Sequence, residues 1–272
     1  MAQITLRQYQ KEAVEFALNR KNCQLLLKTG TGKTLISLVA LKTLLKRKLV
    51  DKAVIACTKT STVVFQKEFM NMFNFKVKVI EKADDFIEFL NSNNKVCVIK
   101  HSMFKNLGSD LQYIKELKKI YKEKKLKISL IIDEAHKLSS DTGATQKYYR
   151  NVAWLFDRCT LLTATPYSSS LEQLYGLIQL IYPTLWRTKA EFTDKYIDYL
   201  VIRDRQNFKK VLRKEILRYK NLGDLRSVIE PFTFFYYPPT KLNFYYHKTR
   251  LKDYSEYNML AKGLISLKNE EE

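Results

Sequence analysis

The sequence is poor in residues that interrupt regular structure, with seven glycines and five prolines among 272 residues. We find no internal repeat, low-complexity block or glycine-serine linker, so we expect one compact body plus a helical appendage. The four cysteines form no CxxC pair, which indicates neither a zinc site nor a disulfide framework and suits a reducing compartment. Met1–Gln10 lack a signal-peptide pattern, and no apolar run approaches a membrane span. We therefore expect a soluble intracellular protein, cytoplasmic or nuclear, with no membrane partner.

Acidic residues are also scarce: 28 Asp and Glu stand against 48 Lys and Arg, leaving a formal charge of +20. A field of this sign attracts polyanions and favours a nucleic-acid partner. The alternative is a solubility surface in a lysine-rich proteome, because abundant Lys, Asn, Ile and Tyr fit an AT-rich genome.

Short apolar runs alternate with longer amphipathic ones, which predicts an α/β fold with a mostly parallel sheet flanked by helices. The predicted strands are Gln24–Leu27, Ala53–Ala56, Val96–Ile99, Ile128–Ile132 and Thr160–Leu162. The predicted helices are Arg7–Asn19, Lys33–Lys46, Val63–Met72, Asp84–Phe89, Leu111–Lys124, Thr145–Leu155 and Leu171–Ile181. Small or polar residues follow each strand, where open α/β sheets bind ligands.

The first such junction reads LKTGTGKT, residues 27–34. A glycine-rich turn that opens a helix presents backbone N–H groups and a positive dipole end to phosphates. Lys33 would reach the terminal phosphates of a nucleoside triphosphate, and Thr34 would place a hydroxyl on Mg²⁺. The full P-loop pattern has glycine where Leu27 stands, so this is the helicase-style variant.

A second junction, LIIDEAH at residues 130–136, supplies the acidic half of the same site. Asp133 would hold Mg²⁺, and Glu134 would orient and deprotonate the attacking water. Two further motifs flank this pair. In LRQYQ, Gln10 has an amide that can both donate to and accept from adenine. In LTATP, Thr163 and Thr165 can hydrogen-bond the acidic motif and sense the phosphate site.

The order LRxYQ, TGTGKT, DEAH, TATP resembles that of superfamily-2 helicases and translocases. Residues 53–69 and the segments after TATP are similar to Swi/Snf-type ATPases, so the resemblance covers nearly the whole chain. It implies a RecA-like P-loop NTPase lobe that uses ATP and Mg²⁺. The implied nucleotide-binding residues are Arg7, Gln10, Thr29, Gly30, Thr31, Gly32, Lys33 and Thr34. The implied catalytic residues are Lys33, Asp133, Glu134 and His136, with Thr34 and Asp133 as the Mg²⁺ ligands.

The resemblance also implies that His136, Thr163 and Thr165 couple the nucleotide site to movement. It assigns contact with a nucleic-acid backbone, duplex DNA being favoured, to two loops. Their residues are Lys59, Thr60, Ser61, Lys100, His101 and Ser102. Two alternatives stay open: the lysines as solvated surface charges, and His101 as a histidine satisfied within the fold.

The family completes its site with an arginine from a second RecA-like lobe, in a motif containing Gly-Arg or Gly-Gln. The chain has neither dipeptide, so we expect the first lobe of a two-lobed motor that hydrolyses ATP slowly alone. We assign residues 1–185 to the ATP-binding lobe and 186–230 to a helical insertion. Residues 231–272 would form a return strand and an exit helix, Arg250–Leu267, toward the absent lobe.

The aromatic stretches Phe232–Tyr237 and Phe244–Tyr246 are interpreted as extended strands that pack under the second lobe, because prolines flank them, with base stacking as the alternative. Three further readings of the whole chain stay open: the lobe of a DEAH-type RNA helicase, a restriction-type translocase subunit, and a non-catalytic, nucleotide-gated module that binds nucleic acid.

Overall fold

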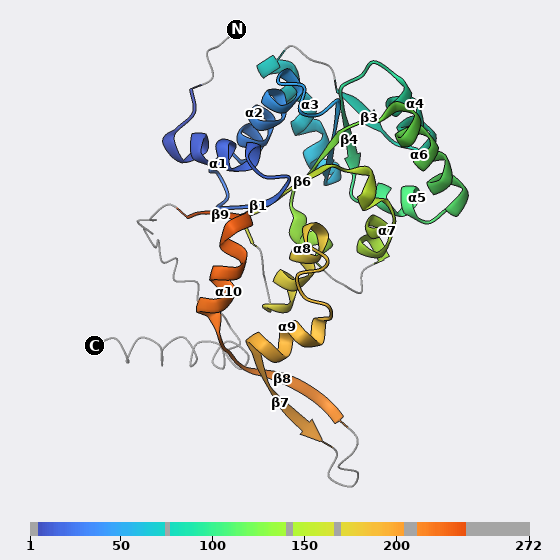
Figure 1. The fold of residues 1–272 in the computed structure, drawn as a ribbon. Helices are drawn as coiled ribbons and strands as arrows, with labels where there is room; N and C mark the ends of the chain where they lie inside the picture. Colours follow the sequence, from blue (N-terminus) through green and yellow to red (C-terminus); the bar gives the residue numbers. More distant parts are fainter. Residues whose placement is uncertain (1–4, 74–76, 140–143, 166–169, 204–210, 238–272) are drawn as a thin grey trace, which may run out of the picture. The chain divides into compact units, whose positions relative to one another are not determined.

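A seven-stranded parallel sheet forms the centre of the fold (Figure 1). The structure is a computed structural model that describes residues 5–73, 77–139, 144–165, 170–203 and 211–237. Across the sheet the strands are β3 (Lys78–Ile80), β4 (Val96–Lys100), β2 (Lys52–Cys57), β5 (Ile128–Ile132), β6 (Arg158–Thr163), β1 (Asn22–Leu27) and β9 (Thr233–Tyr236). Every neighbouring pair is parallel. All seven carboxyl ends therefore meet at one edge, as the predicted α/β fold requires.

Strands such as β2 and β5 are buried along their whole length, because helices cover both faces of the sheet. One face packs against α1 (Gln8–Leu18), α2 (Lys33–Lys46) and α3 (Lys59–Phe73). The other packs against α4 (Ala83–Asn91), α5 (Met103–Gly108), α6 (Leu111–Lys124), α7 (Ala144–Val152) and α8 (Glu172–Ile181). Three short 3₁₀ turns are η1 (Ala135–Leu138), η2 (Ala153–Leu155) and η3 (Glu230–Phe232).

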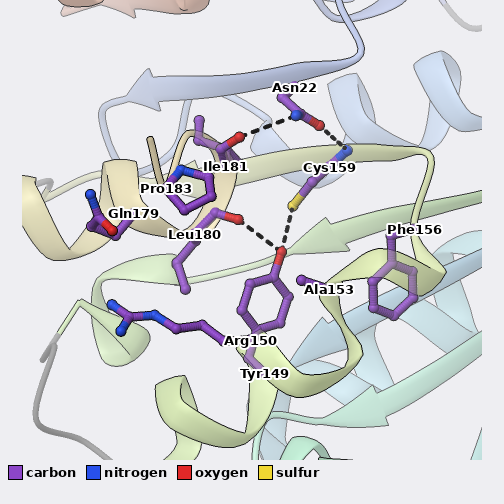
Figure 2. A pocket seen from close by; sticks show the side chains of 10 residues that line it. All are labelled: Asn22, Tyr149, Arg150, Ala153, Phe156, Cys159, Gln179, Leu180, Ile181 and Pro183. Carbon is purple, nitrogen blue, oxygen red and sulfur yellow. Dashed lines mark hydrogen bonds between the residues drawn. The ribbon is translucent and has the colours of Figure 1, made fainter. Parts of the chain in front are cut away.

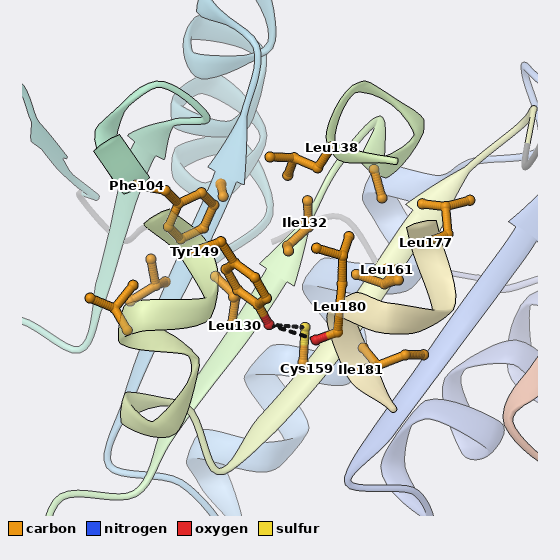
Figure 3. Packing of buried hydrophobic residues seen from close by; sticks show 14 of the residues in the cluster. Phe104, Leu130, Ile132, Leu138, Tyr149, Cys159, Leu161, Leu177, Leu180 and Ile181 are labelled. Carbon is orange, nitrogen blue, oxygen red and sulfur yellow. Dashed lines mark hydrogen bonds between the residues drawn. The ribbon is translucent and has the colours of Figure 1, made fainter. Parts of the chain in front are cut away.

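Tyr149 of α7 anchors the second face of the core, as Figure 3 shows. Its ring meets Phe104 of α5 edge-on, with 5.1 Å between the ring centroids. Its buried hydroxyl donates to the carbonyl of Leu180 in α8 at 2.9 Å. The side chain thereby fills apolar space and satisfies its own polar end, as a buried tyrosine must.

Gly176 lets α8 approach the turn that follows the DEAH motif. A Cβ atom at this position would lie 1.6 Å from the backbone oxygen of Ser139. Gln146 of α7 donates to the Gly176 carbonyl at 2.8 Å, which fixes the helix on its other side. Only glycine permits this contact between α8 and the DEAH turn.

Lys52, the first residue of β2, is a buried lysine with 4% of its surface exposed. Its ammonium donates to three carbonyls at the end of α4 and just beyond, those of Phe89 at 2.9 Å, Ser92 at 2.8 Å and Asn94 at 2.7 Å. The contact caps the helix with a positive charge, which its dipole favours. Burial nevertheless lowers the pKa of Lys52 to about 8.

In the described residues of the predicted helical insertion, 186–203 and 211–230, helix forms at the two ends. It contains α9 (Lys189–Tyr196), the strands β7 (Ile197–Arg203) and β8 (Val211–Tyr219), and α10 (Leu222–Ile229). The strands pair antiparallel, with Ile197 opposite Tyr219 and Tyr199 opposite Ile216. Cross-strand pairs of β-branched and aromatic residues favour a ribbon over a helix, so the helical prediction is wrong for this middle part. The proposed domain boundaries stay predictions.

The stretch that follows α10 is extended, as predicted from its aromatic residues, and forms β9 at the sheet edge. Phe234 packs against Phe16 with 5.6 Å between ring centroids, and Tyr236 stacks on Tyr9 at 3.8 Å. These rings therefore pack within this lobe. The second aromatic stretch and the predicted exit helix lie outside the described residues.

The five predicted strands are all present, and β3 and α5 are additional elements. Each of the seven predicted helices is present, with its ends moved by a few residues at most. Among the helices that the structure describes, none combines the length and apolarity that crossing a bilayer demands.

Candidate functional site

The carboxyl edge of the sheet gathers the sequence motifs. The glycine-rich loop follows β1, and the DEAH motif follows β5. The TATP motif begins at Thr163, the last residue of β6. Because β1 and β5 both pair with β6, the three motifs lie on adjacent strands. The two loops predicted to contact nucleic acid follow β2 and β4, which continue the same edge on the other side of β5.

The glycine-rich loop has the backbone that its sequence predicts. Gly30 and Gly32 both adopt positive φ, +80° and +85°, a region that costs other residues energy. Gly32 is the N-cap of α2, so Lys33 and Thr34 lie in the first turn of a 14-residue helix. The loop therefore ends at a helix N-terminus, with the free N–H groups and positive dipole end that suit phosphate.

Lys33 is buried at 9% exposure and lies at the floor of this loop. Its ammonium donates to the carbonyl of Leu27, the last residue of β1, at 3.3 Å. Lys33 is also close enough to Asp133 for its charge to lower the pKa of that carboxyl. The structure thus brings the basic and acidic halves of the predicted site together.

Gln10 contacts the glycine-rich loop directly. The amide nitrogen donates to the carbonyl of Thr31 at 3.0 Å, and the amide oxygen accepts from the backbone N–H of Arg7 at 2.9 Å. Gln10 is 6% exposed, so both ends of its amide are engaged inside the fold. Adenine contact stays a prediction and requires these bonds to rearrange.

Tyr9 adds a second bond to the same carbonyl, donating from its hydroxyl to Thr31 at 2.9 Å. Arg7 is the N-cap residue of α1 and its side chain is exposed, as is Thr29 at the loop tip. The α1 helix therefore holds the inner part of the loop and leaves its tip accessible.

Asp133 and Glu134 begin the turn after β5. Asp133 is 7% exposed, and burial raises its pKa; the adjacent Glu134 charge raises it further. The backbone N–H of Glu134 and the charge of Lys33 act in the opposite direction and lower the pKa of Asp133. Glu134 adopts the left-handed region, with φ 48° and ψ 48°, which is unusual for a residue other than glycine. Backbone strain of this kind is concentrated at functional sites.

His136 links the acidic motif to the TATP motif. Its Nδ1 lies 3.3 Å from Glu134 Oε2 and 3.1 Å from the Thr163 hydroxyl. Thr163 is fully buried, and its hydroxyl accepts from the backbone N–H of Thr165 at 3.2 Å. These contacts join Glu134 to the end of β6 in a continuous chain. The predicted coupling role of the three residues stays a prediction, with this chain of bonds as its structural basis.

The two loops predicted to contact nucleic acid have both exposed and inward residues. Lys59, Thr60 and Ser102 are exposed, and Lys100 is half-buried. Ser61 is half-buried, and its hydroxyl lies 2.9 Å from that of Thr58. The ring of His101 bonds through Nε2 to the Asp133 carbonyl at 2.8 Å, and burial lowers its pKa.

The bond of His101 agrees with the alternative left open from the sequence, a histidine satisfied within the fold, although its partner in the acidic motif was not expected. Strand order is the signal that could have predicted this partner, because β4 lies next to β2, and β2 lies next to β5. His101 contacts a backbone oxygen, which every residue carries, so the residue type at position 133 could not reveal the contact.

The donor set suits Mg²⁺ carried by a triphosphate. A hydroxyl at Thr34 and a carboxylate at Asp133 are hard oxygen donors, which Mg²⁺ prefers. Asp133, with its raised pKa, is a buried carboxylate that a cation would stabilise in its charged form. The residues therefore fit the predicted cofactor.

A separate pocket of ≈ 360 Å³ lies at the amino ends of β1 and β6 (Figure 2). Asn22 spans it, donating to the Ile181 carbonyl and accepting from the backbone N–H of Cys159, both at 3.1 Å. Since these polar groups and the Tyr149 hydroxyl are satisfied by neighbouring chain, the pocket is a seam between α7, α8 and the sheet.

Comparison with known proteins identifies the family. The model of the family ResIII, described as the res subunit of type III restriction enzymes, matches residues 3–168. This match covers more than half of the chain. The chain belongs to the ResIII family.

Curated relatives of this ResIII chain carry similar names. Chromodomain-helicase-DNA-binding protein 6 of Mus musculus is 25% identical over 228 residues, 78% of this chain and 8% of that protein. Protein CHROMATIN REMODELING 5 of Arabidopsis thaliana is 28% identical over 245 residues, 84% of this chain and 14% of that protein. The chain thus spans a small part of the length of these relatives.

A solved structure shows the same fold. The SWI2/SNF2 ATPase core of Sulfolobus solfataricus in complex with dsDNA matches with a TM-score of 0.62 and 17% identity, over 85% of this chain and 44% of that one. The ResIII chain therefore has the RecA-like α/β fold that its sequence predicts. It is the N-terminal lobe of a superfamily-2 helicase and is similar to Swi/Snf ATPase cores.

Proposed function

We propose that this lobe binds ATP with Mg²⁺ in a nucleic-acid-dependent ATPase that translocates on or remodels DNA. The observation that carries the proposal is the convergence of Lys33 and Asp133 beside a glycine-rich loop of positive-φ geometry. The formal charge of +20 supports a polyanionic partner. The names of the relatives and the duplex bound by the solved structure favour DNA over RNA.

The residues present divide the chemistry between them. The loop N–H groups and Lys33 would hold the phosphates, with Thr34 and Asp133 placed to hold Mg²⁺, which neutralises phosphate charge when bound. Glu134 would orient the attacking water and accept its proton. His136 keeps the Glu134 carboxylate in place through their 3.3 Å contact and passes its position on to Thr163.

Full hydrolysis requires a second lobe in this proposal. An arginine supplied from outside the site accelerates phosphoryl transfer by about 10³–10⁵ in related chemistry. This chain covers 44% of the solved SWI2/SNF2 core, which leaves room for such a lobe in the parent protein. Full DNA-stimulated turnover by the 272-residue chain alone would contradict this requirement.

Glu134→Gln tests the proposed function against a non-catalytic module. The amide keeps the size of the side chain and loses its basicity, so the parent protein should lose ATP turnover by at least about 10²-fold while retaining nucleotide binding. The measurements are a phosphate-release assay and titration with a fluorescent nucleotide analogue. Unchanged turnover would refute the assigned role. Turnover of the parent with duplex DNA, single-stranded DNA and RNA separates a DNA translocase from an RNA helicase.

A restriction-type translocase subunit is the second candidate, favoured by the family match over residues 3–168. Both candidates use the same ATP site and DNA partner. The parent protein distinguishes them, because ATP-dependent cleavage of DNA supports restriction and its absence with nucleosome or protein displacement supports remodelling.

A further inference from the structure

The strand β9 ends beside the glycine-rich loop. Leu27, the last residue of β1 before the loop, lies opposite Tyr236 in the sheet. The Tyr236 carbonyl accepts from the backbone N–H of Lys28, the first residue after β1, at 3.3 Å. The hydroxyl of Tyr237 donates to the carbonyl of Ala164, in the TATP motif, at 3.0 Å. The end of β9 is therefore bonded to two of the loops that form the candidate site.

Tyr236 also supports a side chain that holds the glycine-rich loop. Its ring stacks on that of Tyr9, in the first turn of α1, with 3.8 Å between the centroids and 6° between the ring planes. The hydroxyl at the far end of the Tyr9 ring donates to the Thr31 carbonyl at 2.9 Å, and Gln10 donates to the same carbonyl at 3.0 Å. Tyr236 thus keeps the Tyr9 ring in the plane from which its hydroxyl reaches the loop.

The direction of the Thr31 carbonyl decides where the N–H of Gly32 points. The peptide between these residues is trans, so its C=O and N–H groups point in opposite directions. Bonds from Tyr9 and Gln10 hold the carbonyl toward α1, and the Gly32 N–H therefore points away from α1. Gly32 is the N-cap of α2, where backbone N–H groups suit phosphate. A loop that is fixed before its ligand arrives loses less conformational freedom on binding.

We propose that Tyr9 and Tyr236 are positioning residues for the phosphate-binding loop. The stacked pair presents the Tyr9 hydroxyl to the Thr31 carbonyl and so directs the Gly32 N–H toward a bound phosphate. The inference rests on the proposed function and gives β9 a part in it. Displacement of the end of β9 releases Tyr9 and weakens phosphate binding, and by linkage a bound phosphate stabilises β9 in its place.

Packing alone is the alternative role of the two rings, because both are partly buried against the core on the α1–α3 face. If they only pack, their alteration lowers stability and leaves the affinity of the folded protein unchanged. A second aromatic pair offers a matched comparison. Phe16 and Phe234 come from the same helix and strand, lie 5.6 Å apart between centroids, and carry no hydroxyl that could hold the loop.

The experiment titrates the 272-residue chain with a fluorescent, non-hydrolysable ATP analogue in Mg²⁺. Displacement of the analogue then gives the affinity for inorganic tripolyphosphate, which has no base and reports on the loop alone. Tyr236→Leu removes the stacked ring, and Tyr9→Phe removes only the hydroxyl. Each should weaken binding of both ligands by about two- to tenfold.

Three further variants separate positioning from packing. Tyr236→Phe keeps the stacked ring and should restore most of the affinity that Tyr236→Leu loses. The double variant Tyr9→Phe/Tyr236→Leu should bind no more weakly than the weaker single variant, because the two residues act in series. Phe234→Leu, the packing control, should leave both affinities unchanged.

The outcomes distinguish this inference from the proposed function. If the unaltered chain binds neither ligand, both are refuted. If it binds both ligands with affinities that Tyr236→Leu and Tyr9→Phe leave unaltered, the positioning role alone is refuted. A loss confined to the ATP analogue would assign the pair to the base and contradict its role in the loop, and an equal loss in Phe234→Leu would reduce the effect to packing. If circular dichroism shows that Tyr236→Leu is unfolded, Tyr9→Phe carries the test.

Discussion

Lys52 makes the stability of the fold depend on pH in a direction that can be calculated. Burial lowers its pKa from 10.5 to about 8, so between these values the unfolded chain binds the proton more tightly than the folded chain does. Stability must therefore rise with pH in this window, and the penalty of the buried charge is fully present below the lower value. The full shift corresponds to about 3 kcal/mol, of which about 1 kcal/mol is recovered between pH 7 and pH 9.

Lys52→Met isolates this contribution, because methionine keeps the apolar stem and cannot titrate. Urea unfolding at pH 7, 8 and 9, followed by circular dichroism, gives the free energy of unfolding for both proteins. The difference, unaltered chain minus Lys52→Met, should increase by about 1 kcal/mol over this range. Lys115→Met, at an exposed lysine of α6, is the control and should give a constant difference.

If the difference in the free energy of unfolding between the unaltered chain and Lys52→Met stayed constant from pH 7 to pH 9, the reasoning would be refuted. A constant difference would show that the three carbonyls of Phe89, Ser92 and Asn94, all within 2.9 Å, offset the whole cost of burying the ammonium. If this free-energy difference fell as the pH rises, the three carbonyls would more than offset the cost of burial and would raise the pKa of Lys52.

Three glycine substitutions give further predictions. Gly176→Ala should lower the free energy of unfolding by about 3 kcal/mol or more in urea titration, because its Cβ would lie 1.6 Å from Ser139 O and must move α8 or the DEAH turn. Gly223→Ala in α10 has open space around the Cβ and should be neutral or stabilising by up to about 1 kcal/mol; equal effects of the two would contradict the packing. Gly32→Ala places a Cβ 2.7 Å from Gln10 Nε2 at a φ of +85°, so we expect at least about tenfold weaker binding of a fluorescent ATP analogue with little loss of secondary structure. Unaltered affinity in Gly32→Ala would show that the loop geometry is not required.

The sheet could be predicted because its strands are short, continuous apolar runs that end in polar residues. The parallel, doubly covered sheet follows from that pattern, and the glycine-rich loop follows from motif and position. β3 escaped prediction because three residues are too few to show a pattern. The β7–β8 ribbon was mistaken for helix because its mixture of charged and aromatic residues fits either periodicity.

The side-chain roles at the site were harder to predict than its location. Gln10 was expected to face adenine, yet in this structure its amide is bonded to Thr31 and Arg7. His101 was assigned to nucleic-acid contact, with a role inside the fold as the alternative, and its ring bonds inward to the Asp133 carbonyl. These contacts depend on backbone atoms and on strand order, neither of which is encoded in the identity of a single residue.

The position of β1 has a consequence for synthesis of the protein on the ribosome. β1 bonds to β6, with Asn22 opposite Cys159, and to β9, where Gln24 bonds to Thr233, 209 residues later. The strand that leads into the glycine-rich loop therefore stays unpaired until β6 has been synthesised, and it gains its second neighbour only with β9. During that interval the apolar residues of β1 are open to aggregation or chaperone capture, and contacts of such long range slow folding. A nascent chain should gain nucleotide binding only after β6, which joins β1 to β5, has left the exit tunnel.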